Sequence, residues 1–214
     1  MKLTKNIVKK IEGELYNNDI DLSEGNAFYL SSIKDNLFCV FTRKDNHFSS
    51  FFSDDSSPKL NPFFDKLTKM LLSNDLDGNG CFDYEHYFKN EYDNVKAKAN
   101  NYLNYSLNLI LIKISKGKIE PVSFFTYLNG YIWNVCTEQN SRNNGYMTIL
   151  FKHFLKLLKE GEFKEQVQLY DNSLSLNLLK KNPKFYKTKQ FYEENGFIIV
   201  QNLPDKIVLV MKIN

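Results

Sequence analysis

The residues best suited to binding a ligand form one short polar loop, Arg142-Asn143-Asn144-Gly145-Tyr146-Met147. An apolar run precedes the loop and a helical pattern follows it, so the loop is predicted where a strand hands over to a helix N-terminus. The first backbone N–H groups of a helix have no acceptor within it, and the positive end of its dipole points outward. Such a place suits a phosphate, although an ordinary strand-turn-helix fits the same residues.

Two elements must position this loop. The run Ile132–Cys136 is predicted to be a strand, and a helix is predicted from about Gly145-Tyr146 to Gly161. Lysines in the last turn suit the negative end of the helix dipole, and Gly161 is placed to act as a C-terminal cap. The helix carries a broad apolar stripe of Leu150, Phe151, Phe154, Leu155, Leu157 and Leu158.

The strand, the Arg-x-x-Gly-x-x loop and the amphipathic helix together resemble the acetyl-CoA-binding motif of the GNAT superfamily of N-acetyltransferases. Tyr192, near the end of a helical stretch and followed by a Gly196 turn and Phe197, resembles the second signature of that family. The remaining predicted strands follow the order of the family: Leu107–Ser115, Val122–Leu128, Gln166–Tyr170, Phe197–Val200 and Ile207–Ile213.

The resemblance implies an α/β fold: a GNAT-type mixed, mostly antiparallel, twisted sheet flanked by helices, with an N-terminal extension. We expect residues 1–35 to form the extension, as a helix plus a strand, and residues 36–214 to form the acetyltransferase-like domain. Residues 59–104 are expected to be a helical insert on the acceptor-substrate side. Ile7, Val8, Ile11 and Leu15 indicate the N-terminal helix, and Phe63, Phe64, Leu67, Met70 and Leu71 the buried face of the first inserted helix.

The function implied by the resemblance is transfer of an acetyl group from acetyl-CoA to a primary amine, by direct attack in a ternary complex. Tyr192 would protonate the leaving thiolate. The backbone of Val135, Cys136 and Thr137 would polarise the thioester carbonyl if their strand carries a splay or bulge. The amides of Arg142, Asn143, Asn144, Gly145, Tyr146 and Met147 would wrap the pyrophosphate, and Asn182 would contact the pantetheine arm, with Asn172 and Asn177 as alternatives.

Several assignments have alternatives. Met147 stands where the family usually has Gly or Ala, and its side chain could crowd the pyrophosphate. Glu120 and Glu138 are the candidate general bases, but each also fits a plain surface carboxylate. Tyr192 also fits an aromatic packed under the last strand. A non-catalytic acyl-CoA-binding or protein-interaction module with the same fold is therefore the second hypothesis.

Composition narrows the class of protein. The 214 residues carry a net charge of only +3, and the lysines are scattered among acidic residues, so we expect no nucleic-acid partner. No apolar run reaches the length of a membrane span, and the charged residues 1–14 do not resemble a signal peptide. The separated cysteines Cys39, Cys81 and Cys136 suit buried thiols in a reducing compartment, so we expect a cytoplasmic protein.

No metal site is expected. The histidines His47, His86 and His153 share no ligand spacing with a cysteine. The segment Asp75–His86 resembles the first half of an EF-hand loop, with Asp75, Asp77 and Asn79 at ligand positions. His86 stands where that loop needs a bidentate Glu, so calcium affinity should be poor and a polar turn is the better interpretation.

Overall fold

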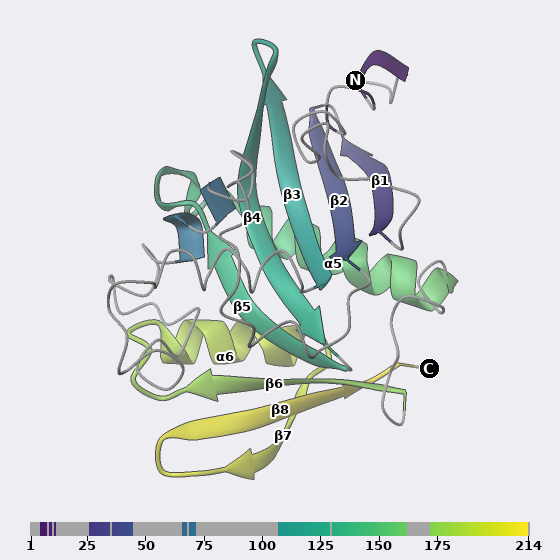
Figure 1. Cartoon of the computed structure of the whole chain (residues 1–214). Helices are drawn as coiled ribbons and strands as arrows, with labels where there is room; N and C mark the ends of the chain where they lie inside the picture. Colours follow the sequence, from purple (N-terminus) through teal and green to yellow (C-terminus); the bar gives the residue numbers. More distant parts are fainter. Residues whose placement is uncertain are drawn as a thin grey trace, which may run out of the picture.

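A computed structural model describes residues 5–7, 9, 11, 26–34, 36–44, 66–67, 69–71, 107–128, 130–161 and 172–213. The strands of these residues form one eight-stranded sheet in the order β1-β2-β3-β4-β5-β6-β8-β7 (Figure 1). They are β1 Asn26–Lys34, β2 Leu37–Lys44, β3 Leu107–Ser115, β4 Lys118–Leu128, β5 Tyr131–Thr137, β6 Ser173–Leu179, β7 Ile198–Asn202 and β8 Lys206–Lys212.

Neighbouring strands of the sheet are antiparallel, except that β5 and β6 are parallel. The parallel pair is joined at a single position, Tyr131 with Ser175, and the two strands part beyond it. The predicted mixed, mostly antiparallel sheet is therefore confirmed, and one place in it lacks a continuous hydrogen-bond ladder.

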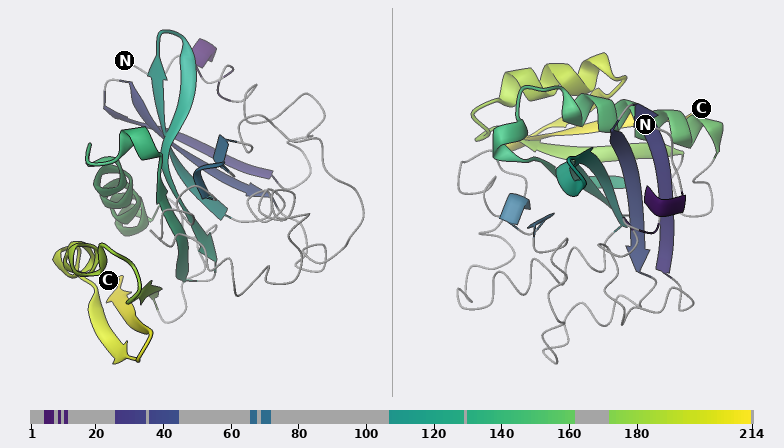
Figure 2. Two further views of the ribbon diagram at one scale, coloured as in Figure 1. Left: turned by 90° about the vertical axis from the view of Figure 1, so that its left-hand side faces the viewer. Right: turned by 90° about the horizontal axis from the view of Figure 1, so that it is seen from above.

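Two helices lie along the same side of the sheet, α5 Tyr146–Glu160 and α6 Phe185–Glu194 (Figure 2). The short 3-10 helix Gln139–Ser141 links β5 to α5. Helical residues 66–67 and 69–71 lie on the opposite side, and the apolar ones among them, Leu67, Met70 and Leu71, are buried as predicted. The described strands are thus flanked by helical residues on both faces.

Helix α5 begins and ends where its sequence predicts. The cap residues Gly145 and Gly161 both have left-handed backbones, with φ of 71° and 77°. Gly161 donates its N–H to the carbonyls of Leu157 and Leu158, which satisfies acceptors in the last turn. The predicted apolar stripe is buried against β3, β4 and β5, with Leu155 only partly buried.

Aromatic side chains join the two helices to the sheet. Phe151 on α5 has its ring centroid 6.0 Å from that of Phe125 on β4 and 5.6 Å from that of Phe191 on α6. It also lies 6.0 Å from the ring of Tyr192 and 5.9 Å from the ring of Phe197, which precedes β7. Phe151, 1 % exposed, therefore connects α5 to α6, to β4 and to the residue before β7.

The strand that pairs with β5 was not singled out from the sequence. The predicted strand Gln166–Tyr170, with Val167 beside Val135, lies outside the described residues, and the strand paired with β5 is β6, Ser173–Leu179. Leu174, Leu176 and Leu178 alternate with polar or half-buried residues and are buried, which is the pattern of a strand with one covered face. Most of the insert 59–104, including the calcium-like segment Asp75–His86, also lies outside the described residues.

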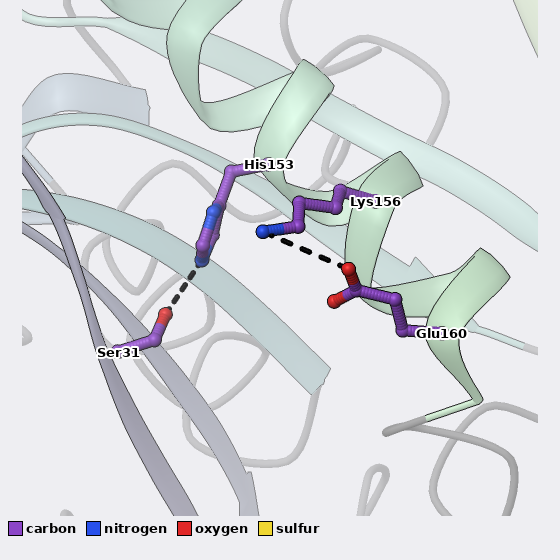
Figure 3. Close-up of polar contacts among 4 residues, drawn as sticks. All are labelled: Ser31, His153, Lys156 and Glu160. Atoms are coloured by element: carbon purple, nitrogen blue, oxygen red, sulfur yellow. Dashed lines mark hydrogen bonds and ion pairs between the residues drawn. The ribbon is translucent and has the colours of Figure 1, made fainter.

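Strand β1 falls within the expected extension 1–35, yet it pairs with β2 along the edge of the same sheet. It also contacts α5, because Ser31 Oγ and His153 Nε2 are 2.6 Å apart in a hydrogen bond (Figure 3). The same figure shows Lys156 and Glu160, an exposed pair on α5 at 3.6 Å. His153 therefore links α5 to β1, the strand at the edge of the sheet.

We expect Ser31→Ala to lower the free energy of unfolding by about 1 kcal/mol, because it removes one partly buried hydrogen bond. Glu160→Gln is the matched control, since it removes an exposed ion pair whose contribution is about 0–1 kcal/mol and usually near zero. Urea titrations of both variants measure the two effects. Equal midpoints for Ser31→Ala and the unsubstituted protein would show that β1 is not held through His153.

Candidate functional site

A cavity of about 860 Å³ lies where β5 and β6 part. Its walls are β5, β6, the loop and first turn of α5, one side of α6 and the start of β8. Its size is within the range of small-molecule and cofactor sites. Residues from the loop 141–143 and from α6 line one cavity together, although about 40 residues separate them in the sequence.

The N-terminus of α5 opens into this cavity. Arg142, Asn143, Gly145, Tyr146 and Met147 all line it, and Ile149 N–H to Gly145 O, 3.0 Å, is the first hydrogen bond of the helix. Among the described residues no side chain caps this end. A Cβ on Gly145 would have no atom within 4 Å, so the left-handed backbone, and not crowding, selects glycine there. These features leave room for an anion at the positive end of the helix dipole.

Charges around the cavity are mostly positive. Arg142, Lys184, Lys187 and Lys206 line it, and among the described residues Asp205 is the one carboxylate that does so. Lys184 caps the start of α6 and Lys187 lies in its first turn, while Asp205 lies in the turn between β7 and β8 and Lys206 begins β8. The cavity therefore favours an anionic ligand.

The wall formed by β5 is irregular. Phe124 pairs with Cys136 and Thr126 pairs with Trp133, so Phe125 alone faces the two residues Asn134 and Val135. This is a β-bulge on β5, and Asn134 within it has a positive φ of 49°. The strand thus has both the bulge and the splay on which the expected polarising role of its backbone depends.

Tyr192 lies in the cavity wall and also in the aromatic core. It is 3 % exposed and makes edge-to-face ring contacts with Phe151, Phe191 and Phe197, with centroids 5.2–6.0 Å apart. The core position agrees with a packing role, and the cavity position agrees with a chemical one. The proton-donor role therefore stays a prediction that substitution has to test.

Two of the three alternative asparagines reach the cavity. Asn182 lines it, but its Oδ1 accepts the N–H of Lys184 at 2.8 Å and so helps to form the turn before α6. Asn177 also lines the cavity, from an exposed position on β6 opposite the wall of β5. Asn172 is not part of the lining. Asn177 is thus placed to contact an extended ligand between the strands.

Four predicted site residues are not among those that line the cavity. Cys136 is fully buried behind it, and Asn144 turns its amide to the carbonyls of Ser141 and Arg142. Glu120 is exposed on β4, and Glu138 accepts a hydrogen bond from Asn140 at 3.3 Å. The role of either glutamate as a general base therefore stays a prediction.

The buried thiols fit their predicted structural role. Cys39 and Cys136 are both fully buried, and burial raises the pKa of Cys39 to about 12. Cys39 is therefore protonated at neutral pH and is no nucleophile. Cys81 lies outside the described residues.

Sequence reasoning did not single out several cavity residues. Tyr131 and Trp133 line it with ring centroids 4.5 Å apart, and Lys184, Lys187 and Asp205 supply charge. Tyr131 and Trp133 are two positions apart on a strand, so their side chains lie on the same face of the sheet. This spacing could have identified them together. Asp205 lies in the turn between β7 and β8, and this turn is beside the end of β6 because β8 pairs antiparallel with β6.

The described residues contain no group of three or more His, Cys, Asp or Glu side chains able to hold a metal ion. No helix among them is long and apolar enough to cross a membrane.

Comparison with protein-family models and with curated proteins finds no match. Solved structures do match. A candidate N-acetyltransferase from Lactobacillus plantarum is 10% identical with a TM-score of 0.49, and covers 84% of this chain and 100% of its own. An aminoglycoside 6'-acetyltransferase type Ii is 16% identical at a TM-score of 0.46, covering 76% and 96%. The PaiA N-acetyltransferase from Thermoplasma acidophilum, in complex with coenzyme A, is 12% identical at 0.43, covering 70% and 92%.

Each of these solved structures is described as an acetyltransferase. At 10–16% identity they describe what the fold of this chain is similar to. They assign no activity, cofactor or acceptor to it.

Proposed function

We propose that this protein is a cytoplasmic acetyltransferase that moves an acetyl group from acetyl-CoA to a primary amine, by direct attack in a ternary complex. The observation that carries this proposal is the cavity between the parted strands β5 and β6, with the N-terminus of α5 at its mouth. It offers an anion site and an extended slot in one space, which suits a ligand with a pyrophosphate and a long thioester arm.

The cofactor residues follow from this arrangement. The amides at the start of α5, with Arg142 beside them, hold the pyrophosphate, and Met147 contributes its amide from within the first turn. Asn177 and Asn182 contact the pantetheine arm from the β6 side of the slot. The bulged backbone of β5 donates to the thioester carbonyl and stabilises the oxyanion of the tetrahedral intermediate.

Tyr192 is the proposed acid of the reaction. The amine nitrogen attacks the carbonyl carbon, the bond from carbon to sulfur breaks, and the phenol of Tyr192 gives its proton to the departing thiolate. The acceptor ammonium loses one proton to water before its nitrogen attacks. The nitrogen loses a second proton as the amide forms, and through solvent this proton returns the Tyr192 phenolate to a phenol. Glu120 and Glu138 are not among the residues that line the cavity, so either one would act as the base only through water. The acceptor is proposed only as a primary amine.

The second hypothesis is a non-catalytic module that binds acyl-CoA. It is favoured by the charge of the cavity, where Asp205 is exposed and is the one lining carboxylate among the described residues. A site that binds anions well and lacks a buried base would hold acetyl-CoA without deprotonating an amine.

Binding of acetyl-CoA should change the fluorescence of Trp133, the single tryptophan of the chain, because Trp133 lines the cavity. Arg142→Gln should weaken this binding by about 10–100-fold, since it removes a charge-assisted phosphate contact. Lys212→Gln is the matched control, because it removes one positive charge at an exposed position outside the cavity lining. Calorimetry of both variants checks the affinities.

Turnover over a panel of primary amines separates the two hypotheses. Release of the CoA thiol with an amine supports the acetyltransferase, and binding without release supports the module. If adding acetyl-CoA produced no heat and no fluorescence change, both hypotheses would be overturned.

A further inference from the structure

The bulge of β5 contains a residue with a left-handed backbone. Asn134 is one of four described non-glycine residues with a positive φ, and it lies inside a strand, where neighbouring residues are extended. A left-handed backbone is unfavourable for a residue with a Cβ, so surrounding contacts have to offset its cost.

The contact that does so crosses to β4. Asn134 Nδ2 donates to Thr126 Oγ1 at 3.1 Å, and both residues are buried, with exposures of 6 % and 1 %. A buried amide without such a partner would be costly, so this hydrogen bond selects the backbone that lets the side chain reach Thr126. Asparagine also enters the left-handed region more readily than other residues with a Cβ.

The position of this bond is what gives it a consequence for a ligand. Asn134 and Val135 line the cavity, and they lie beyond Tyr131, the last point at which β5 is paired with β6. The backbone of the bulge therefore borders the slot instead of a neighbouring strand. A change in the bulge alters where the N–H groups of this segment lie relative to anything bound there.

We propose that Asn134 is a positioning residue, and that its hydrogen bond to Thr126 aims the bulged backbone of β5 at the thioester carbonyl of the bound acyl donor. This rests on the proposed function, because it assigns the polarising group of that same site. The geometry is sensitive: a displacement of about 1 Å in a reacting group can cost about 100-fold in rate.

The test uses Thr126→Val, which keeps the shape of the side chain and removes the acceptor of the Asn134 amide. Thr126→Ser keeps the hydroxyl and should therefore behave like the unsubstituted protein. Tyr127→Phe is the matched control, because the next residue of β4 accepts the Gly130 N–H through its own hydroxyl at 2.7 Å and does not line the cavity. Thr126→Val and Tyr127→Phe each remove one hydroxyl acceptor from β4.

The readout is the carbon-13 chemical shift of the carbonyl in labelled acetyl-CoA bound to each variant, which reports hydrogen bonding to that oxygen. We expect a downfield shift in the unsubstituted protein, in Thr126→Ser and in Tyr127→Phe, and a smaller shift in Thr126→Val. The rate constant kcat should fall by about 10–100-fold in Thr126→Val, with the affinity for acetyl-CoA unchanged within a few-fold.

The outcomes separate the two proposals. Bound acetyl-CoA with the same carbonyl shift in Thr126→Val and Tyr127→Phe overturns the positioning role and leaves the acetyltransferase standing. A reduced shift without turnover on any amine supports the positioning role and argues against catalysis. Absence of acetyl-CoA binding overturns both. If Thr126→Val fails to fold, Asn134→Gly replaces it, because glycine allows the left-handed backbone and removes the amide.

Discussion

Tyr192→Phe is expected to lower kcat by about 10²–10⁴-fold, the range for losing general acid assistance. The substitution removes the phenolic hydroxyl and leaves the ring, so the edge-to-face contacts of Tyr192 with Phe151, Phe191 and Phe197 are retained. Affinity for acetyl-CoA should therefore change little, and the loss should lie in kcat. Steady-state kinetics with calorimetry of the cofactor measures both quantities.

The control for this experiment is Tyr186→Phe, the same change on the same helix. Tyr186 is 84% exposed and is not among the residues that line the cavity. Its loss of a hydroxyl should leave kcat within a few-fold of the unsubstituted protein. Thermal melts identify a misfolded variant. A well-folded Tyr192→Phe enzyme with normal turnover would mean that Tyr192 only packs.

Phe151→Ala is expected to lower the free energy of unfolding by about 3–5 kcal/mol, the usual cost of truncating a buried phenylalanine. The reason is its position, since four other rings from β4, α6 and the segment before β7 contact it. Stabilities of single domains are about 5–15 kcal/mol, so this one change removes a large fraction. Urea denaturation followed by circular dichroism measures the shift of the midpoint.

Lys152→Ala is the control, because Lys152 is the next residue of α5 and is exposed. Its effect should stay within about 0.5 kcal/mol. A loss below 1 kcal/mol for Phe151→Ala would indicate that the two helices are held to the sheet by other contacts, or that the site collapses around the smaller side chain.

The residues that could be placed from the sequence are those with strong local signals. Helix α5 was predicted at its observed bounds because its apolar stripe is long and Gly161 ends it. The strand before it was predicted within one residue, and Tyr192 was singled out as a site residue that the structure places in the cavity wall. A periodic pattern and a terminating glycine act over one turn or one strand, so no distant contact is needed to recognise them.

The residues that could not be placed depend on contacts between distant segments. Ser173–Leu179 was not singled out as a strand, because its pairing with β5 and β8 depends on segments distant in the sequence. Asn134 gave no local sign of a bulge, because its left-handed backbone depends on Thr126 in another strand. Asp205 reaches the cavity because β8 begins opposite the end of β6, with Lys206 paired to Leu179, and no local pattern encodes that pairing.

The single bridge between β5 and β6 has a consequence for cooperativity. A continuous ladder would couple opening of one half of the sheet to the other through backbone hydrogen bonds. Here β1 to β5 and β6 to β8 are joined by one bridging pair, so their coupling depends on the aromatic contacts of α5 and α6. The two halves are therefore suited to open as separate units, at the very place where a ligand would enter.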